Sequence, residues 1–308
     1  MIEIKKLTRY YGSLAALQDL DLDIREGDIF GFIGPNGAGK TTTMRILATL
    51  LEPTSGAAFI DGLDVTKKGK QVRRAVGYMP DFMGVYDDLK VFEYLEFFAA
   101  AFGIEPRKRK GIVDGVLELT DLESKKSFAV DSLSRGMQQR LGLARVLIHD
   151  PKVLILDEPA SGLDPRARIE IRELLRELKR MNKTIMISSH ILSELEEICD
   201  HVGIIEHGRL VFSGTMEQII QRMGLHTKVK VRVVSDPERA VELLAVLPDI
   251  ADVVADGNTL SVTFADGHEN KGLLARTLVK ADIDIVAIEP QKLKLDDAFL
   301  QLTKGLVH

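Results

Sequence analysis

The segment at residues 34–42, GPNGAGKTT, limits what this chain can fold into more than any other stretch. It follows an apolar run at residues 29–33, which predicts a short buried strand, and it precedes residues 43–50, whose apolar spacing predicts a helix. A glycine-rich loop between a strand and a helix is the context that a phosphate-binding loop requires, because glycines let successive backbone N–H groups point at one phosphate. We therefore predict nucleotide binding here.

Within this loop, Lys40 is expected to reach the β- and γ-phosphates, and the Thr41 hydroxyl is expected to hold Mg²⁺. A glycine-rich turn that matches by accident is the alternative, and average glycine usage would produce one in roughly a hundred chains of this length. The neighbouring strand and helix make an accident rarer still. The residues predicted to bind the nucleotide are Asn36, Gly37, Ala38, Gly39, Lys40, Thr41 and Thr42.

Length and charge limit the class of protein. The chain has 308 residues, which is long for one hydrophobic core and favours two domains. A net charge of −5 argues against nucleic acid as a partner. The single cysteine, Cys199, rules out a disulfide framework and suits a reducing cytosol. Since no apolar run reaches membrane-spanning length and the N-terminus lacks a signal-peptide core, we expect a cytoplasmic protein that meets a membrane through a partner.

Two carboxylates follow the apolar run at residues 153–156, which predicts a buried parallel strand. Ligands of open α/β sheets bind at the carboxyl ends of such strands. Asp157 can therefore complete the Mg²⁺ shell begun by Thr41, and Glu158 can orient and deprotonate a water molecule. Ordinary surface carboxylates are the alternative, which is hard to hold beside a phosphate-binding loop in the same chain.

Two further residues are site candidates. His190 follows the apolar run at residues 184–189, which places it at the same sheet edge as Asp157, although a lone histidine is more often structural. Tyr11 stands just before a glycine turn, where an aromatic residue is usually a packing residue. A nucleotide base also needs a flat stacking surface, so both interpretations of Tyr11 stay open.

Two polar turns precede predicted helices. Residues 131–136, DSLSRG, form an ordinary N-cap signal and also a second helix start that could bind an anion. In SGLDP, Asp164 is the predicted N-cap and Pro165 the first residue of a helix that runs to about residue 181. Residues 74–79 are expected to form a strand. The basic cluster at residues 107–110 is expected to be a solvated loop, not a nucleic-acid site.

The pattern changes after residue 224. Strands and helices alternate there in the order βαββαβ, with a last predicted helix, which is the ferredoxin-like arrangement of small regulatory or interaction domains. We see no catalytic constellation in this part. The strands are expected at residues 228–234, 250–255, 259–264 and 283–288, and the helices at residues 237–247, 269–280 and 295–302.

In order and spacing, the motifs GPNGAGKTT, LSRGMQQR, VLILDEP, SGLDP and SSH resemble those of the ATP-binding subunits of ABC transporters, over residues 2–222. The LSRGMQQR segment is the most specific, because a phosphate-binding loop alone marks many classes of NTPase. The resemblance implies an α/β fold of the P-loop NTPase, ABC type. Its domain would span residues 1–224, with a mostly parallel sheet core, an N-terminal antiparallel β subdomain and a helical subdomain at about 89–145. A C-terminal α+β ferredoxin-like regulatory or interaction domain would follow at 227–308.

The resemblance also implies ATP and Mg²⁺ as ligands and a head-to-tail homodimer that encloses two nucleotides. Glu158 resembles the general base of the family, and His190 resembles its γ-phosphate sensor. Asp164 resembles the residue that couples the two sites, and Tyr11 the aromatic that stacks on adenine. The residues implied to contact the nucleotide of the partner subunit are Ser134, Arg135, Gly136 and Met137.

The chain departs from the family pattern in places. Asp81 stands where the family has glutamine, so it is expected to act on the metal through a water molecule. Arg135 and Met137 replace a common glycine and glutamine, while the phosphate-contacting Ser134 and Gly136 are kept. The ending LKLDDAFLQLTKG resembles the tail of exporter-type ATPases that work with separate transmembrane permease subunits.

Three classes of function compete. The leading hypothesis is an ATP-driven motor of an ABC exporter, peripheral at the inner face of the membrane. The second is a soluble ABC ATPase. Translation factors of this class carry two cassettes and repair ATPases carry a long coiled coil, and this chain shows neither. The iron–sulfur-assembly type stays open, although it usually lacks a separate tail domain. The third is a nucleotide-dependent binding switch without turnover, against which Glu158 and His190 argue.

Overall fold

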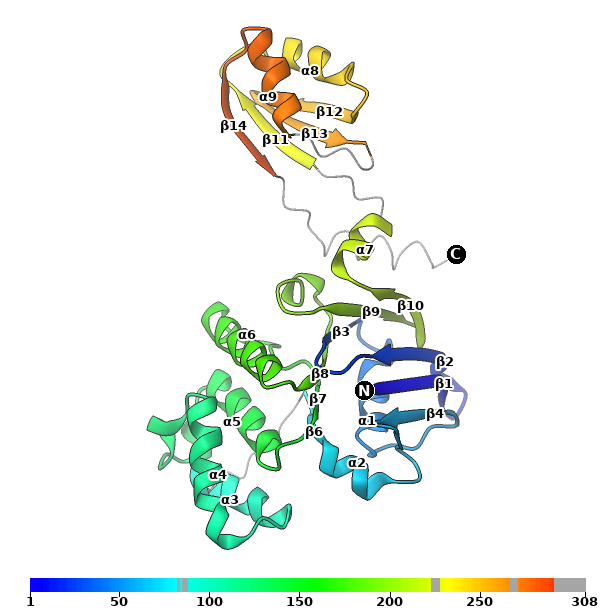
Figure 1. The fold of residues 1–308 in the computed structure, drawn as a ribbon, viewed down its shortest axis with the longest axis vertical. Coiled ribbons are helices and arrows are strands. Elements are labelled where there is room, and N and C mark those ends of the chain that lie inside the picture. Colours follow the sequence, from blue (N-terminus) through cyan, green and yellow to red (C-terminus); the bar gives the residue numbers. More distant parts are fainter. Residues whose placement is uncertain (82–83, 85–87, 223–227, 266–270, 291–308) are drawn as a thin grey trace. The chain divides into compact units, whose positions relative to one another are not determined.

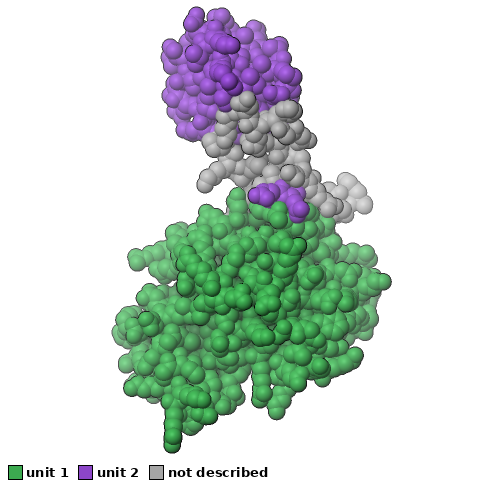
Figure 2. Space-filling model, in the orientation of Figure 1, with its two compact units in different colours: residues 1–216 green, residues 217–308 purple. Residues whose placement is uncertain are grey.

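The computed structural model describes residues 1–81, 84, 88–222, 228–265 and 271–290. The chain divides into two compact units, residues 1–216 and residues 217–308 (Figures 1 and 2). The sequence pattern places the first boundary at residue 224, whereas the structure divides the chain at the start of the short helix α7 (Met216–Arg222). None of the helices in the described ranges is long and apolar enough to span a lipid bilayer.

A six-stranded sheet forms the centre of the first unit, in the order β10-β9-β3-β8-β7-β6. Five of the strands are parallel, and β10 pairs antiparallel with β9 through a tight turn. In this turn His207 and Gly208 have φ values of 47° and 77°, as a type I′ hairpin requires, so the predicted hairpin is confirmed. The strands are β3 (Ile29–Ile33), β6 (Val76–Met79), β7 (Val153–Leu156), β8 (Thr184–Ser189), β9 (His201–Glu206) and β10 (Arg209–Gly214).

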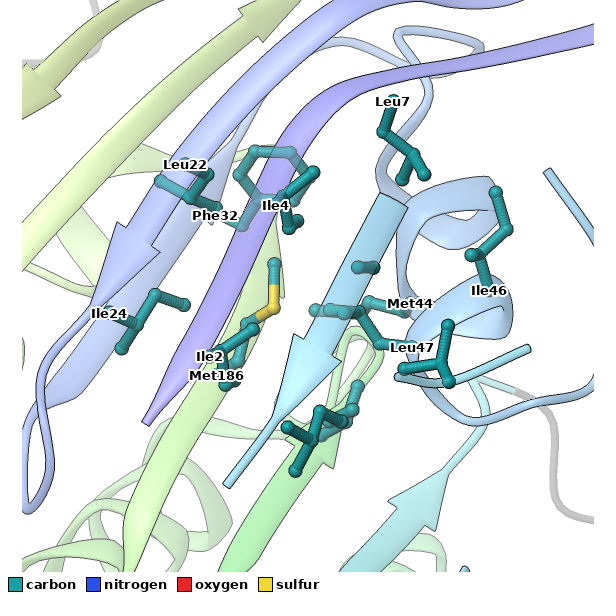
Figure 3. Close-up of a cluster of buried hydrophobic side chains, with 14 of the residues drawn as sticks. Ile2, Ile4, Leu7, Leu22, Ile24, Phe32, Met44, Ile46, Leu47 and Met186 are labelled. Carbon is teal, nitrogen blue, oxygen red and sulfur yellow. The ribbon is translucent and has the colours of Figure 1, made fainter. Parts of the chain in front are cut away.

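A second, antiparallel sheet in the order β2-β1-β4-β5 packs against the central one. Figure 3 shows the core between them, where Ile4 of β1 and Leu22 of β2 face Phe32 of β3 and Met44 of α1 (Lys40–Leu47). The alternation of apolar and polar residues in the first 24 residues produces this one-sided sheet, and the predicted N-terminal antiparallel subdomain is confirmed. Its strands are β1 (Ile2–Tyr11), β2 (Leu14–Ile24), β4 (Ser55–Ile60) and β5 (Leu63–Asp64).

Helices cover the opposite face of the central sheet (Figure 1). Helix α6 (Pro165–Arg180) packs beside α5 (Arg135–Leu147), and α3 (Val91–Ala101) and α4 (Pro106–Leu119) pack on α5. The helices α3, α4 and α5 fill the region predicted as helical. Because both faces of the sheet are covered, β3, β7 and β8 are buried along their whole length, as their apolar sequences require.

Two local predictions are wrong. The basic cluster at residues 107–110 lies in the first turn of α4 and not in a loop, because Pro106 fixes a helical φ at its first position. Three of its four side chains are exposed, so the cluster is solvated as expected. Arg74 lies in the last turn of the helix α2 (Gly69–Ala75) and does not start a strand, since Val72 turns one face of this helix into the core.

The second unit has its own antiparallel sheet, in the order β12-β13-β11-β14, and its own apolar core. This strand order, with one helix after the first strand and one after the third, is the predicted ferredoxin-like arrangement. The predicted helix at residues 295–302 lies outside the described residues. The elements are β11 (Lys228–Val233), α8 (Pro237–Ala245), β12 (Ile250–Asp256), β13 (Thr259–Phe264), α9 (Lys271–Lys280) and β14 (Ile285–Pro290).

Because each unit buries a core of its own, each should fold alone. We expect a chain truncated after Gly224 to unfold in one cooperative thermal transition and to keep the nucleotide affinity of the full chain. Circular dichroism melts and equilibrium nucleotide binding test this expectation. A truncated chain without a cooperative transition would show that the first unit needs residues beyond 224.

Candidate active site

A cleft of about 290 Å³ opens at the carboxyl edge of the central sheet. It is bounded by the loop between β3 and α1 and by residues that follow β6, β7 and β8. The seven loop residues predicted to bind the nucleotide line it, together with Asp81, Glu158 and His190, but the eighth candidate, Tyr11, does not. The full lining is Ala16, Pro35, Asn36, Gly37, Ala38, Gly39, Lys40, Thr41, Thr42, Asp81, Glu158, Ser161 and His190.

The loop before α1 takes a shape that only glycine allows at one position. Gly39 has a φ of 111° and serves as the N-cap of α1. A Cβ atom on Gly39 would lie 2.7 Å from the carbonyl oxygen of Ala16, so a side chain cannot fit there. The loop thus curls around the start of α1, whose free N–H groups and positive dipole end suit a phosphate.

Lys40 is held at the floor of this loop with only 6% of its surface exposed. Its Nζ donates hydrogen bonds to the carbonyl oxygens of Gly34, at 2.6 Å, and Pro35, at 3.3 Å, and lies 3.6 Å from a Glu158 carboxylate oxygen. Burial lowers the pKa of Lys40, and the nearby Glu158 carboxylate opposes that shift. The ammonium group is therefore a poorly hydrated cation that an incoming phosphate would stabilise.

Asp157 presents one unpaired oxygen beside the cleft. The residue is 1% exposed, and its Oδ1 accepts a 2.6 Å hydrogen bond from the Ser188 hydroxyl. Its Oδ2 is buried and has no hydrogen-bond partner among the described residues. A buried carboxylate oxygen in this state is costly unless a cation or donor arrives. With the Thr41 hydroxyl on the same cleft, the donors are oxygens of the kind that Mg²⁺ prefers.

Glu158 leaves the strand direction and turns into the cleft. Its φ of 51° lies in the left-handed region, which costs a non-glycine residue roughly 1–2 kcal/mol. Its backbone N–H donates to the Ser188 Oγ at 2.9 Å, and its Oε2 lies 2.9 Å from the His190 Nδ1. Glu158 is thus set between Lys40 and His190, with its carboxylate directed to the space beside the phosphate-binding loop.

Ser188 is the residue of this cluster that the sequence analysis left without a role. It is 1% exposed and bonds both Asp157 and Glu158. The available signal was its place on β8, directly beside β7: Leu156 pairs with Ile187, so the next residues of both strands are neighbours at the carboxyl edge. Ser161 also lines the cleft and was not predicted as a site residue.

Tyr11 is not among the residues that line the cleft. It ends β1, 43% of its surface is exposed, and the guanidinium of Arg9 lies over its ring at 4.9 Å from the centroid. The ring is accessible to a base, but within this chain it packs with Arg9.

The residues of the LSRGM segment lie at the start of α5, away from the cleft of their own chain. Ser134 is the N-cap and accepts a hydrogen bond from the Met137 N–H at 3.4 Å. A Cβ atom on Gly136 would lie 2.9 Å from the Ala167 side chain, so this glycine lets α5 approach α6 closely. The Arg135 guanidinium lies against Gly162, where a Cβ atom would be 2.5 Å from its Nη1.

Asp164 performs the local role that its position predicts. Its Oδ1 accepts a hydrogen bond from the Ala167 N–H at 3.0 Å, which caps α6, with Pro165 at the first helical position. Asp164 does not line the cleft either. One chain therefore gathers the phosphate loop, Asp81, Asp157, Glu158 and His190, but not the segment around Ser134 or Asp164.

Comparisons with known proteins agree with this geometry. The family model described as ABC transporter matches residues 17–161. The chain is 39% identical over 307 residues to the bacitracin transport ATP-binding protein of Bacillus licheniformis, which covers 99% of this chain and 98% of that protein. It is 34% identical over 304 residues to the Nod factor export ATP-binding protein I of Rhizobium sp. (strain N33), covering 98% and 96%.

Solved structures resemble the first unit. An ATP-binding subunit of an ABC transporter aligns with a TM-score of 0.66 and 32% identity, covering 73% of this chain and 94% of that one. A dimeric ATP-binding cassette bound to ADP and Pi aligns with a TM-score of 0.63 and 24% identity, covering 70% and 99%, which speaks for the fold. The phosphate loop and Glu158 line one cleft, and relatives match over nearly their full length. This protein therefore belongs to the ABC transporter family, as an ATP-binding subunit with the fold of an ABC-type ATP hydrolase.

Proposed function

We propose that this protein is the motor subunit of a membrane exporter, in which two copies bind ATP head to tail and drive a separate transmembrane permease. The observation that carries the proposal is the placement of the Glu158 carboxylate between Lys40 and His190 at the phosphate loop. The relatives that match along nearly the whole chain are named for bacitracin transport and Nod factor export, which favours an exporter. The names of those relatives do not identify the substrate that this protein helps to transport.

The chemistry follows from the residues of the cleft. The loop N–H groups and Lys40 hold the β- and γ-phosphates of ATP, and the Tyr11 ring stacks on the base. Thr41 and Asp157 would hold Mg²⁺, and Asp81 would act on it through a water molecule. The bound ion would neutralise the charge of the phosphates. Glu158 accepts the proton of the attacking water, and His190 orients Glu158 and senses the γ-phosphate.

The Glu158→Gln variant tests the assignment of the general base. The amide cannot accept the proton of the water, so we expect turnover to fall by about 10²-fold or more while ATP affinity is kept. The stalled complex should accumulate as an ATP-bound dimer. Steady-state phosphate release, nucleotide binding and size-exclusion chromatography measure the three effects. Near-normal hydrolysis in this variant would remove Glu158 from the role.

A head-to-tail dimer would bring the start of α5, the second predicted anion-binding site, to the nucleotide of the partner subunit. The N-terminus of α5 carries Ser134 and Arg135 and has no acidic residue in its first turn, yet it does not line the cleft of its own chain. In the dimer we propose, residues Ser134, Arg135, Gly136 and Met137 of one chain contact the nucleotide held by Lys40 of the other. Asp164, at the start of the neighbouring helix α6, then couples the two sites.

Mixing two inactive variants tests the shared site. Lys40→Ala removes the phosphate-binding ammonium, and Ser134→Arg fills the α5 start, so each homodimer should be inactive. In a heterodimer one site keeps both Lys40 and Ser134. With random exchange about a quarter of all sites regain activity. Mixed samples in which heterodimers form but no hydrolysis returns would refute the head-to-tail arrangement.

An apolar groove of about 390 Å³ supports a separate permease partner. It lies between the helical region and the central sheet, and its walls include Leu50, Phe98 and Phe102, of which Leu50 and Phe102 are exposed. Pro80 lines this groove and the next residue, Asp81, lines the nucleotide cleft. A protein segment seated in the groove would therefore touch the same backbone turn that the nucleotide touches. We propose that a cytoplasmic segment of the permease docks there.

Phe102→Ser, with Phe128→Ser as its control, tests this docking. The two phenylalanines are similarly exposed, at 43% and 47%, and each ring contacts one polar neighbour, but Phe102 alone of the two lines the groove. We expect Phe102→Ser to keep basal hydrolysis and to lose co-purification of a multi-span membrane protein from detergent-solubilised membranes of the native host. Phe128→Ser should retain both. Equal recovery of that membrane protein with both variants would contradict the proposal.

Other classes of function explain less. An iron–sulfur-assembly ATPase accounts for the cleft but not for the full-length match to transport proteins, tail included. A binding switch without turnover leaves the Glu158–His190 pair without a purpose. We further propose that the protein is cytoplasmic and peripheral at the inner face of the membrane. Its second unit, residues 227–308 by the sequence pattern, serves regulation or partner binding.

A further inference from the structure

We propose that Ser188 is a positioning residue: its hydroxyl fixes the Asp157 carboxylate and the Glu158 backbone together, and so ties metal binding to water activation. This inference rests on the function proposed above and deepens it. It starts from the observation that one buried hydroxyl bonds two consecutive acidic residues: it donates to the Asp157 carboxylate and accepts from the Glu158 N–H.

The two hydrogen bonds fix the orientation of the hydroxyl. A serine hydroxyl has one proton to donate and two lone pairs to accept with. The Ser188 hydroxyl donates a hydrogen bond to Asp157 Oδ1, at 2.6 Å, and its oxygen accepts a hydrogen bond from the Glu158 N–H, at 2.9 Å. Because Ser188 is 1% exposed, water cannot easily replace either bond. The hydroxyl is therefore a rigid link between two residues that are adjacent in sequence but serve different functions.

For Asp157, the link decides which oxygen remains available. Oδ1 is engaged by a short bond to an ionised acceptor, a strong type of hydrogen bond. Oδ2 is left buried and without a partner among the described residues, and it is thus the atom that a metal ion would take. Partners that orient metal-binding side chains matter nearly as much as the ligands themselves. Without the Ser188 hydroxyl, the carboxylate could rotate and present its oxygens differently.

For Glu158, the link holds a strained backbone. The left-handed conformation, with a φ of 51°, is what turns this side chain out of the strand and toward the phosphate loop. Lys40 and His190 contact the far end of the side chain, whereas Ser188 holds the N–H of the residue itself. Losing that bond would let the peptide relax and move the carboxylate away from the attacking water.

The neighbouring Ser189 provides a matched control. It has the same side chain, lies on the same strand and is 2% exposed. Its hydroxyl donates to Glu194 at 3.0 Å and accepts from the Ile191 N–H at 3.0 Å. These partners lie in the segment after β8 and not at Asp157 or Glu158. A general effect of removing a buried hydroxyl from this strand should therefore affect Ser188→Ala and Ser189→Ala alike.

The first experiment compares Ser188→Ala, Ser189→Ala and Ser188→Thr in the purified full chain. Fluorescent ATP binding is measured with Mg²⁺ and with EDTA, beside hydrolysis against Mg²⁺ concentration. For Ser188→Ala we expect turnover to fall about 10- to 100-fold and half-saturating Mg²⁺ to rise about tenfold, with affinity in EDTA unchanged. Ser189→Ala should stay near wild type, and Ser188→Thr, which keeps a hydroxyl, should retain most turnover. An equal loss of affinity with and without Mg²⁺, or no change in Mg²⁺ dependence, would overturn the proposal.

A second experiment places Ser188→Ala in the Glu158→Gln background. If Ser188 acts on turnover through Glu158, the double variant at saturating Mg²⁺ should hydrolyse ATP no more slowly than Glu158→Gln alone, while the shift in Mg²⁺ dependence of binding persists. Multiplied losses of turnover would refute the coupling. Normal turnover of Glu158→Gln alone would instead refute the role of Glu158 as general base. The Mg²⁺ dependence of nucleotide binding in Ser188→Ala would still test whether Ser188 orients Asp157 for the metal ion.

Should Ser188→Ala fail to fold, Ser188→Thr and Ser188→Val make the same comparison. Their side chains have nearly the same shape and differ by the hydroxyl. We expect the valine variant to lose Mg²⁺-dependent binding relative to the threonine variant by the same factor of about ten. Equal behaviour of the two would show that the hydroxyl does not position Asp157.

Discussion

The parallel pairing of β7 with β8 is the constraint on which the active site depends. Leu156 lies opposite Ile187, so the two strands end level at one edge of the sheet. The acidic residue that follows one strand therefore meets the hydroxyl of the other, and the Ser188–Asp157 hydrogen bond is the direct result. Both strands are buried along their whole length because helices cover one face of the sheet and the antiparallel sheet covers the other. The polar residues of the active site therefore lie at the carboxyl ends of the strands.

The same chain carries two helix starts suited to anions, and only one faces its own cleft. The start of α1 lies in the phosphate loop, where Gly39 and the buried Lys40 line the cleft. The start of α5 carries Ser134 and packs through Gly136 on α6. An ATPase in which a second copy supplies this α5 start would hydrolyse only when dimeric, which makes dimer closure a natural point of control for a motor.

The two residues after β6 line two different surfaces. Pro80 lines the apolar groove between the helices and the sheet, and Asp81 lines the nucleotide cleft. A partner in the groove and a nucleotide in the cleft would thus act on one short turn, a direct route by which each could influence the other. An aspartate in this turn, in place of the glutamine of the family pattern, adds a charge where the two surfaces meet. The second unit folds around a separate core and contributes no residue to the lining of this cleft among the residues described.

The sequence by itself determined the phosphate loop, the buried strands before Asp157 and His190, the N-cap signals at the starts of α5 and α6, and the βαββαβ order of the second unit. These features depend on local periodicity and on glycine, proline and capping residues, which act over a few positions. Two helices were not predicted correctly: α4, which starts early because Pro106 fixes a helical φ at its first position, and α2, whose Val72 is buried in the core.

Only the tertiary structure decided which side chains meet. The role of Ser188, the unpaired Oδ2 of Asp157 and the left-handed turn at Glu158 arise from contacts between residues about thirty positions apart, which no local pattern encodes. The structure also shows that the segment around Ser134 does not line the cleft of its own chain, where α5 packs on α6 through Gly136. Sequence fixes the chemical groups of this enzyme, and strand register and helix packing fix which of them act together.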